Sequence, residues 1–320
     1  MEGKKNQLIL VEGLTGLGKS TLAHFIASQF QYNGIKAAWI HEGEDPHPVS
    51  LDLDGDIETF MDKSIEKWKA FVIQIMKSET TTIIEASFFN NLIETLFSHC
   101  LNRTAIIDFG MKLQQVIIPA RPALIYLTHP KISVALQENF RNRGTEFQDF
   151  VIEYITNTSI AKVKNWDDYA GMVAFWGEFS AITDILFKEY EIDKLAVDVS
   201  KGDWEKVHQQ VTAFLTLNLV DDPKISFEAA QKYLGCYQFN SGGKCYTIRY
   251  EAGYLLTDIF MNVYTKLIPE NEGVFLAEKW HFTLHFEFDQ FTGDAISFSI
   301  GGRDVDYLKA VGLRAEKVMN

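Results

Sequence analysis

Short apolar runs alternate with longer segments of helical period through the first two-thirds of the chain. Residues 7–11 form a mostly apolar run typical of buried parallel strands, and residues 21–32 carry apolar side chains at helical spacing before Gly34. Similar strand-type runs lie at 35–41, 81–85, 123–127 and 194–199, and helical patterns lie at 57–77, 92–101, 106–116 and 204–217. Strands separated by helices in this way predict an α/β domain with a parallel sheet and right-handed crossovers.

The pattern changes after a polar stretch at residues 219–223, which we interpret as a linker. Beyond it, strand-type runs arrive at short intervals, at 233–238, 244–250, 254–258, 263–267, 280–288 and 295–300. The turns at 240–243 and 290–293 are hairpin-like, and residues 281–288 alternate apolar and polar side chains. We therefore expect two domains: residues 1–220 with the parallel sheet, and residues 221–320 with a smaller antiparallel β-sheet or partial barrel.

The charge balance excludes some classes of partner. The chain has 320 residues, of which 47% are hydrophobic, which is normal for a globular protein with a sizeable core. Its net charge of −13 argues against a broad surface for nucleic acid or anionic membrane, because such binders are usually basic. The uncharged run before Glu12 is too short for a signal peptide, and we expect no later segment to approach a membrane span.

The cysteines are few and show no metal-type spacing. Cys100, Cys236 and Cys245 form no CxxC pair and are odd in number. We therefore expect three reduced thiols and a cytoplasmic location.

The residues directly after the first strand have the sequence of a phosphate-binding loop, GLTGLGKS, at positions 13–20. The glycines allow the backbone amides to surround an anion, Lys19 can reach the β- and γ-phosphates, and the Ser20 hydroxyl suits Mg²⁺. The order strand, loop, helix is the required one, and the helix N-terminus adds its positive end to the site. We expect ATP to bind at Gly13, Leu14, Thr15, Gly16, Leu17, Gly18, Lys19, Ser20 and Thr21.

Acidic residues follow the second and third strands, where ligands bind in an open parallel sheet. Glu85 is expected to hold Mg²⁺ through a bound water opposite Ser20, or to act as the general base for an acceptor hydroxyl. Glu42 competes for the role of base. The alternatives are a strand-end carboxylate that caps a helix for Glu85, and a solvated loop acid for Glu42.

Two arginines lie in the segment between the fourth and fifth strands. Arg141 and Arg143 precede Gly144, and this arrangement resembles a mobile lid whose guanidinium groups close over a phosphoryl group. The alternative is an ordinary basic helix end that complements the helix dipole. His47 lies between two prolines, and we expect it to be structural or solvated.

From residue 7 to about 217, the chain resembles the thymidylate kinases. The resemblance lies in the sequence VEGLTGLGKST at 11–21. It also lies in the order of the later elements: a third strand that ends in an acid, a lid with arginines, and a last strand before the final helix. Glu42 and residues 85–87 are also similar to the deoxynucleoside kinases, in which a glutamate at the former position serves as the base. The resemblance implies a nucleotide-kinase-like P-loop fold that uses ATP and Mg²⁺. The tail resembles the small β-domain appended to serine-hydrolase-type proteins, which implies no catalytic role.

Two positions depart from these families. Thr15 stands where thymidylate kinases carry an acid, and Ala86 stands where both families carry an arginine that positions the acceptor or its phosphate. Neither dTMP nor a deoxynucleoside is therefore carried over as the substrate.

Together these patterns predict a P-loop kinase that moves the γ-phosphoryl group of ATP to a small, nucleoside- or nucleotide-like hydroxyl or phosphate acceptor. The expected catalytic residues are Lys19, Glu42, Glu85, Arg141 and Arg143. The alternative is a nucleotide-binding switch whose β-domain binds a partner. We expect the partner to be a small-molecule acceptor, and the acidic loop would suit a cationic one. We expect no nucleic acid and no membrane as partners, and a homodimer is a compatible assembly.

Overall fold

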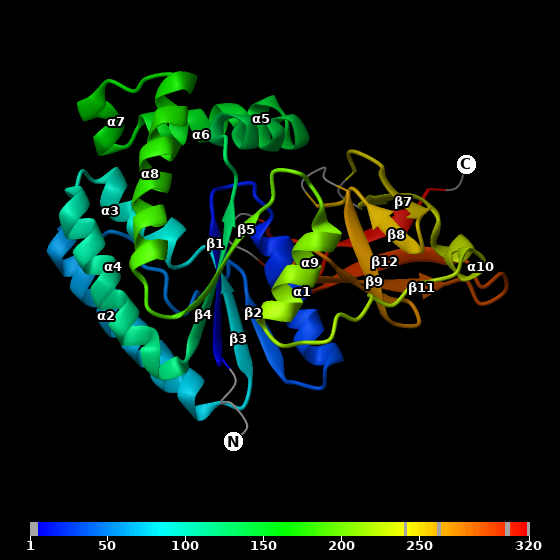
Figure 1. Cartoon of the computed structure of the whole chain (residues 1–320). Coiled ribbons are helices and arrows are strands. Elements are labelled where there is room, and N and C mark those ends of the chain that lie inside the picture. Colours follow the sequence, from blue (N-terminus) through cyan, green and yellow to red (C-terminus); the bar gives the residue numbers. More distant parts are fainter. Residues whose placement is uncertain (1–5, 240–241, 261–263, 305–307, 319–320) are drawn as a thin grey trace. The chain divides into compact units, whose positions relative to one another are not determined.

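The computed structural model describes residues 6–239, 242–260, 264–304 and 308–318, and it groups the chain into two compact units (Figure 1). The first unit contains Met1–Glu42 and Pro46–Leu219. The second contains Val220–Asn320 together with the short segment Gly43–Asp45.

The first unit is built on a five-stranded parallel sheet in the order β2-β3-β1-β4-β5. The strands are β1 Leu8–Gly13, β2 Ala37–Ile40, β3 Thr81–Glu85, β4 Pro122–Thr128 and β5 Asp193–Asp198. Every residue of β1 is buried, as expected for a central strand with helices on both faces. The sheet and the separate β-unit confirm the fold class expected from the sequence.

Helices cover both faces of this sheet (Figure 1). On one side α1 packs against β1, β2 and β3 and against α9, and on the other α4 packs against α2 and α8. The helices are α1 Lys19–Tyr32, α2 Ile57–Lys77, α3 Glu94–Ser98, α4 Arg103–Ile117, α5 Ile132–Arg143, α6 Thr145–Thr156, α7 Ser159–Lys164, α8 Tyr169–Glu189 and α9 Trp204–Phe214.

Helix α2 shows how local sequence sets these elements. Its first free amides are capped by Asp56, whose carboxylate accepts a hydrogen bond from the Thr59 amide at 2.8 Å. Phe60, Trp68 and Ile75 recur along one face and are buried, so the amphipathic pattern turns that face to the core. A fully buried aromatic side chain of this kind contributes roughly 1.5–3 kcal/mol.

The helix expected at residues 92–101 has a different shape. A π-helical turn at Phe89–Ile93 leads into the five-residue helix α3, and the chain leaves it at Cys100 with a positive φ of 63°. A residue of β1 fixes the start of this helical segment, because a Glu12 carboxylate oxygen accepts a hydrogen bond from the Phe88 amide at 2.8 Å. A contact between residues so far apart in sequence leaves no mark in a local pattern.

Helix α8 corrects the expectation that no later segment approaches a membrane span. Within the described residues it is long and apolar enough to cross a membrane by length and composition, with a mean hydropathy of 1.2 over its best window. Its side chains Met172, Phe175, Phe179 and Leu186 are nevertheless part of the hydrophobic core. The core helix of a globular domain passes the same test of length and composition, so this is weak evidence for a membrane span.

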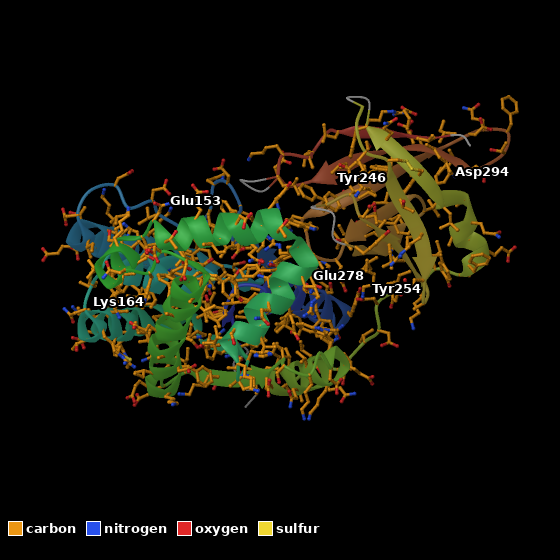
Figure 2. The ribbon with its side chains drawn as sticks, turned by 90° about the horizontal axis from the view of Figure 1, so that it is seen from above. Glu153, Lys164, Tyr246, Tyr254, Glu278 and Asp294 are labelled. Carbon is orange, nitrogen blue, oxygen red and sulfur yellow. A yellow bond between two sulfur atoms is a disulfide. The ribbon has the colours of Figure 1, made fainter. Side chains whose placement is uncertain are left out.

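The second unit is a closed eight-stranded barrel in the order β10-β11-β12-β13-β6-β7-β8-β9. Large side chains such as Tyr237, Phe275, Phe282 and Phe298 are fully buried in it. Figure 2 labels Tyr246 and Tyr254 at the starts of β7 and β8. The strands are β6 Gly235–Phe239, β7 Tyr246–Glu251, β8 Tyr254–Thr257, β9 Thr265–Asn271, β10 Val274–Ala277, β11 Phe282–Phe288, β12 Ala295–Gly302 and β13 Arg314–Lys317, and the short helix α10 Phe227–Ala230 precedes them.

Strands β10 and β13 of the barrel were not expected, and β9 extends beyond the strand expected at 263–267. Strand β9 continues through Pro269, a residue that usually interrupts strands, and a tight turn at Gly273 then leads directly into β10. Strand β13 is short and mostly polar, and Ala315 is its one buried residue. The expected turn at 240–243 lies partly outside the described residues, as does the start of the expected strand at 263–267.

The expectation of three reduced thiols is wrong. Cys236 and Cys245 form a disulfide with their Cα atoms 5.8 Å apart, and Cys100 is a free, exposed cysteine. The pairing arises because β6 and β7 fold back on one another as an antiparallel hairpin. The cytoplasmic expectation therefore loses the support that it took from the cysteines.

Candidate functional site

The phosphate loop lies at the carboxyl end of β1 and turns on three glycines with positive φ: Gly13 at 146°, Gly16 at 80° and Gly18 at 90°. Other residues rarely adopt these angles. Space is also restricted, since a Cβ atom on Gly13 would lie 2.6 Å from the Leu127 carbonyl oxygen. The loop conformation that exposes amides to an anion thus depends on glycine at these positions.

Lys19 is the first residue of α1 and is 7% exposed. Its ammonium donates a hydrogen bond to the Leu14 carbonyl oxygen at 3.2 Å, so the side chain folds back over the loop. Gly18 caps the helix without any side chain, which leaves the first amides of a 14-residue helix available to an anion. These features fit the phosphates of a nucleotide.

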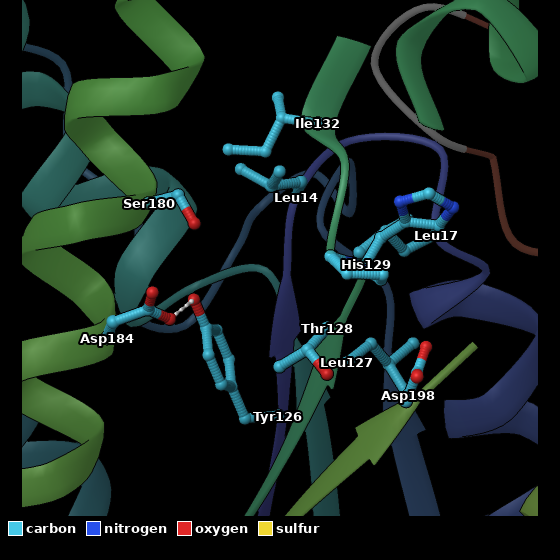
Figure 3. A pocket seen from close by; sticks show the side chains of 11 residues that line it. Leu14, Leu17, Tyr126, Leu127, Thr128, His129, Ile132, Ser180, Asp184 and Asp198 are labelled. Atoms are coloured by element: carbon cyan, nitrogen blue, oxygen red, sulfur yellow. Dashed lines mark hydrogen bonds between the residues drawn. The ribbon is translucent and has the colours of Figure 1, made fainter. Parts of the chain in front are cut away.

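A cavity of about 340 Å³ adjoins this loop (Figure 3). Leu14 and Leu17 of the loop line it, together with Asp184 of α8 and Asp198 at the end of β5, which lie on opposite sides in the view. The Tyr126 hydroxyl donates a hydrogen bond to Asp184 at 3.1 Å. The cavity therefore combines apolar walls with carboxylates, at the edge of the sheet where parallel α/β proteins bind ligands.

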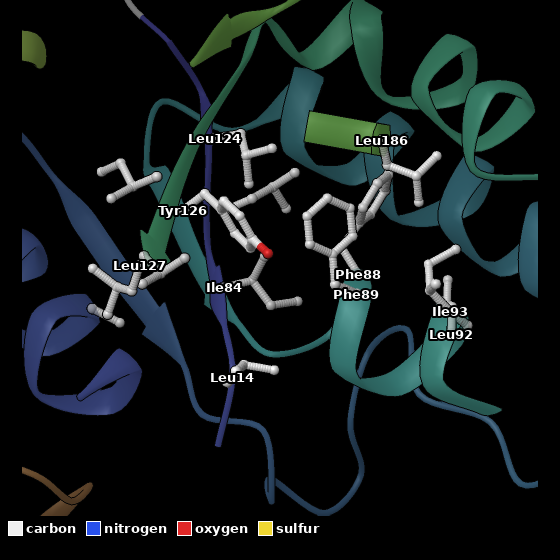
Figure 4. Close-up of a cluster of buried hydrophobic side chains, with 14 of the residues drawn as sticks. Leu14, Ile84, Phe88, Phe89, Leu92, Ile93, Leu124, Tyr126, Leu127 and Leu186 are labelled. Carbon is white, nitrogen blue, oxygen red and sulfur yellow. The ribbon is translucent and has the colours of Figure 1, made fainter. Parts of the chain in front are cut away.

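The loop is anchored in the core of the first unit. Leu14 is 5% exposed and belongs to a cluster of buried apolar side chains drawn in Figure 4, with Ile84 of β3 and Leu127 of β4 among its members. The loop therefore starts from a fixed position relative to three neighbouring strands.

Helix α5 brings an amide group to the loop. The Asn139 side chain is 6% exposed, and a Cβ atom added to Gly16 would lie 2.3 Å from its Cγ atom. Within the part of the chain that the structure describes, the Asn139 Nδ2 atom donates no hydrogen bond. A buried amide of this kind ordinarily has a partner, which makes it a candidate donor to a bound phosphate. Sequence analysis missed Asn139.

Glu85 lies at the end of β3 and is fully buried. Burial raises the pKa of its carboxyl group well above the usual value, and the nearby Glu42 carboxylate raises this pKa further. The Ser20 hydroxyl and the Lys19 ammonium are close enough to lower the pKa. No hydrogen bond of ordinary geometry reaches either Glu85 oxygen from the residues described, although the Ser20 hydroxyl and the Glu42 amide are close enough to lower the Glu85 pKa and His41 Nε2 lies 3.7 Å from Oε1. The structure thus brings Lys19, Ser20, Glu42 and Glu85 together.

These acids do not form a direct metal cage. Across the described ranges, no three histidine, cysteine, aspartate or glutamate side chains come together to hold a metal ion. The Ser20 hydroxyl with the orphaned Glu85 oxygens nevertheless fits Mg²⁺, which keeps several waters and often takes few protein ligands.

Glu12 is a buried acid that sequence analysis did not single out. Burial raises the pKa of its carboxyl group to about 7, and hydrogen bonds from the amides of Phe88, Phe89 and Asn90 oppose that rise. Its main contact fixes the start of the helical segment before α3. The signal in the sequence that could have singled out Glu12 is its position as an acid in the otherwise apolar strand LILVEG.

Glu94, the first residue of α3, is a second acid that sequence analysis missed. It is 7% exposed, and its Oε1 atom accepts a hydrogen bond from the Tyr154 hydroxyl of α6 at 3.3 Å. Burial raises the pKa of the Glu94 carboxyl group to about 8. The Lys19 charge opposes this rise of the pKa, and the Glu42 charge adds to it.

The turn after Glu85 is held by side chains. Ala86 has a positive φ of 52°, which costs a non-glycine residue roughly 1–2 kcal/mol. The Ser87 hydroxyl donates to the Glu85 carbonyl oxygen at 2.8 Å and lies 3.2 Å from His47 Nε2. This strained turn keeps the Glu85 carboxylate at the edge of the sheet.

His47 and Ser87 do not form a hydrolase pair. The His47 Nδ1 atom accepts hydrogen bonds from the Val49 and Ser50 amides, at 3.3 and 2.9 Å. In the neutral ring the proton is therefore on Nε2, which must donate to Ser87 and cannot take its proton. The expectation of a structural role for His47 agrees with these contacts.

The two arginines lie near the end of α5 and face different ways. Arg141 lines a cavity of about 500 Å³ with Tyr169 and Gly144 among its other walls. The Arg143 guanidinium stacks on the Phe147 ring, 3.8 Å from its centroid. Residues two apart on a helix do not share a face, whereas Asn139 and Arg143, four apart, do. Arg143 is thus on the side of α5 that meets the loop.

Comparisons with known proteins identify no family. No protein-family model matches the chain, and no curated protein matches it. The unliganded crystal structure of a sugar kinase from Janibacter sp. HTCC2649 is 16% identical, covering 66% of this chain and 95% of that one, with a TM-score of 0.38. The signal recognition particle receptor FtsY from Elizabethkingia anophelis, in complex with GDP, is 15% identical over 49% of this chain and 48% of its own, with a TM-score of 0.24. Because both TM-scores lie below 0.5, neither likeness says what this chain does.

Proposed function

We propose that this protein is an ATP- and Mg²⁺-dependent phosphotransferase that moves the γ-phosphoryl group to a hydroxyl or phosphate of a small acceptor. The observation that carries the proposal is the pairing of Lys19, folded over the phosphate loop, with the buried and orphaned carboxylate of Glu85 on the neighbouring strand. Phosphoryl transfer needs groups that hold the metal and activate the acceptor, and an acid in this position can serve either task.

The phosphates are bound by groups of the chain itself. The loop amides, the first turn of α1 and the Lys19 ammonium supply positive potential, and Asn139 supplies one more hydrogen-bond donor. The nucleoside part occupies the cavity beside Leu14 and Leu17. Ser20 and Glu85 would hold Mg²⁺, which when bound neutralises charge on the transferring phosphates.

Glu42 or Glu85 acts as the general base for the acceptor. Glu42 is exposed and close to Glu85, so a carboxylate is available to take the hydroxyl proton as the acceptor oxygen bonds to phosphorus. The bond to the bridging oxygen breaks, and its electron pair leaves with ADP. Arg143, on the loop side of α5, would close over the phosphoryl group, where its charge is needed most in the transition state.

The experiment is a screen for acceptor-dependent ADP release, with Mg²⁺-ATP and a library of small alcohols and phosphate esters. The proposal expects at least one compound to raise ADP release well above the rate with ATP alone, and expects Glu85→Gln to abolish the gain. Glu79→Gln, which alters an exposed acid just before the same strand, is the matched control and should keep it. Nucleotide-dependent capture of a partner, with no acceptor found, would instead favour the nucleotide-binding switch.

A further inference from the structure

The cavity of about 500 Å³ that Arg141 lines lies where α5, α6 and the start of α8 pack together (Figure 1). None of the residues assigned above to the nucleotide, the metal or the acceptor lines it. Its volume is in the range of sites for small organic molecules. The polar and aromatic side chains in its walls are Gln137, Phe140, Arg141, Thr145, Gln148 and Tyr169.

The walls of this cavity carry a positive charge and no negative one. Arg141 lines it, and no aspartate or glutamate does. The cavity beside the phosphate loop is different, because Asp184 and Asp198 line that one. In a chain with a net charge of −13, a cavity with this wall favours an anionic ligand.

The Arg141 guanidinium is available to such a ligand. Arg249 and Arg314 each form an ion pair with a glutamate, whereas Arg141 forms none with any residue that the structure describes. Arg141 is exposed, so water solvates its charge until a ligand binds. A guanidinium presents its N–H donors in a planar fork that matches the oxygens of a carboxylate or a phosphate.

The start of α6 adds uncharged donors to the same wall. Gly144 precedes this 12-residue helix and supplies no side-chain cap, so the first amides of α6 have no partner within the helix. The side chains of Thr145 and Gln148 line the cavity beside them. A phosphate group, with three acceptor oxygens and more than one charge, uses more of these donors than a carboxylate does.

Tyr169 gives an independent indication that the cavity takes a ligand. Its hydroxyl oxygen is enclosed and has no hydrogen-bond partner among the residues described. Buried hydroxyl groups ordinarily have one. The buried Phe140 ring lies edge-on to the Tyr169 ring, with the two centroids 6.4 Å apart. These rings offer apolar surface to a carbon skeleton, which points to an organic phosphate rather than an inorganic one.

This cavity is distinct from the nucleotide site. Asn139 lies against Gly16 of the phosphate loop, and Arg141 is two residues further along the same helix. Residues two apart on a helix lie on opposite sides of it, so the Arg141 cavity does not share the Asn139 side of α5. A phosphate held by the loop is therefore not the ligand of this cavity.

We propose that the Arg141 cavity is a second binding site, which takes a small organic phosphate monoester. Arg141 binds the phosphate group, and Phe140 and Tyr169 contact the carbon skeleton. The site does not depend on the proposed phosphotransferase activity.

The test measures binding of matched probes to the full chain by ligand-observed NMR. The probes are phenyl phosphate, benzoate, benzyl alcohol and inorganic phosphate. Mg²⁺ and a saturating non-hydrolysable ATP analogue occupy the phosphate loop, and a second series uses Lys19→Ala without nucleotide. In both series we expect phenyl phosphate to bind roughly tenfold or more tightly than each of the other probes.

Variants show whether Arg141 is responsible. Arg141→Ala should weaken phenyl phosphate binding roughly tenfold or more, and Arg141→Lys, which keeps the charge and loses the fork, should weaken it less. Tyr169→Phe should also weaken it, because it removes the enclosed hydroxyl group. Lys162→Ala removes an exposed cation from α7 and is the matched control, which should bind normally. Unchanged unfolding midpoints would show that the variants are folded.

Three results would overturn the inference: no binding of phenyl phosphate, equal binding of phenyl phosphate and benzyl alcohol, or equal affinity in Arg141→Ala and Lys162→Ala. Benzoate binding as tightly as phenyl phosphate would overturn the choice of a phosphate. Failure of the protein to bind ATP would remove the proposed function, whereas the Lys19→Ala series would still decide whether this second site exists.

Discussion

Asn139 of α5 lies directly against Gly16 of the phosphate loop, so closely that even a methyl group at Gly16 would require the Asn139 side chain to move. The helix that carries the arginine pair is therefore in contact with the loop through a buried amide. Through this contact the Asn139 side chain joins α5 to the phosphate loop.

The Asn139 amide should contribute to nucleotide affinity. Because a single hydrogen bond to a charged group contributes about 1.5–3 kcal/mol, we expect Asn139→Ala to weaken ATP binding roughly tenfold or more. Asn139→Asp should weaken it further, since a carboxylate would face the phosphates. Calorimetric titration with Mg²⁺-ATP measures both. Asn142→Ala, an exposed position on the same helix, should bind as the unaltered protein does, and an unchanged affinity in Asn139→Ala would remove Asn139 from the site.

The two arginines should not be equivalent. Arg143 shares a helix face with Asn139 and Arg141 does not, so Arg143→Ala should lower turnover roughly 100-fold, with a small effect on the KM for ATP. Arg141→Ala should have a clearly smaller effect. Steady-state kinetics of ADP release compare them, and Arg141→Ala as the more damaged variant would contradict this assignment.

Glu94 should make stability fall with rising pH. The native state holds the Glu94 proton up to a pKa of about 8, whereas the unfolded chain releases it near the ordinary value of 4.5. Between those two pH values the folded protein binds more protons than the unfolded chain, so its stability decreases as pH rises. Glu94→Gln removes this contribution, which is on the order of a few kcal/mol at pH 8.

Unfolding by urea at pH 5 and pH 8 measures the effect. Tryptophan fluorescence is a suitable probe, because all tryptophans except Trp280 lie in the first unit. Glu94→Gln should be more stable than the unaltered protein at pH 8 and should differ little from it at pH 5. Equal pH dependence in Glu94→Gln and in Glu153→Gln would show that the Glu94 carboxyl group titrates normally.

The Cys236–Cys245 disulfide predicts how many thiols react in the denatured protein. Without reduction, the denatured protein should show one reactive thiol, Cys100, and after reduction it should show all three. Thiol titration with a chromogenic disulfide reagent gives this number directly. Three reactive thiols before reduction would mean that Cys236 and Cys245 are not joined.

Much of the first unit could be predicted because its signals are local. The phosphate loop is a contiguous motif, the central strands are short apolar runs, and Glu42 and Glu85 follow from the rule that ligands gather at the carboxyl ends of parallel strands. The structure brings these two acids together with Lys19 and Ser20, as the order of elements predicted.

The missed features depend on contacts between distant parts of the chain. Glu12 fixes the turn before α3 across 76 residues, and Glu94 meets Tyr154 across 60 residues. Neither pair leaves a pattern in the sequence around it. In the barrel, β13 was missed because a short polar segment is recognisable as a strand only when its neighbours β12 and β6 are in place.

The central claim is that Mg²⁺-ATP binds at the phosphate loop through Lys19, and calorimetric titration of the full chain with Mg²⁺-ATP tests it most directly. The unaltered protein should bind, and Lys19→Ala should lose roughly 10- to 100-fold in affinity, as expected for a charge-assisted contact. Lys36→Ala, which removes an exposed lysine elsewhere in the same unit, should bind normally. Equal ATP affinity in Lys19→Ala and the unaltered protein would contradict the account.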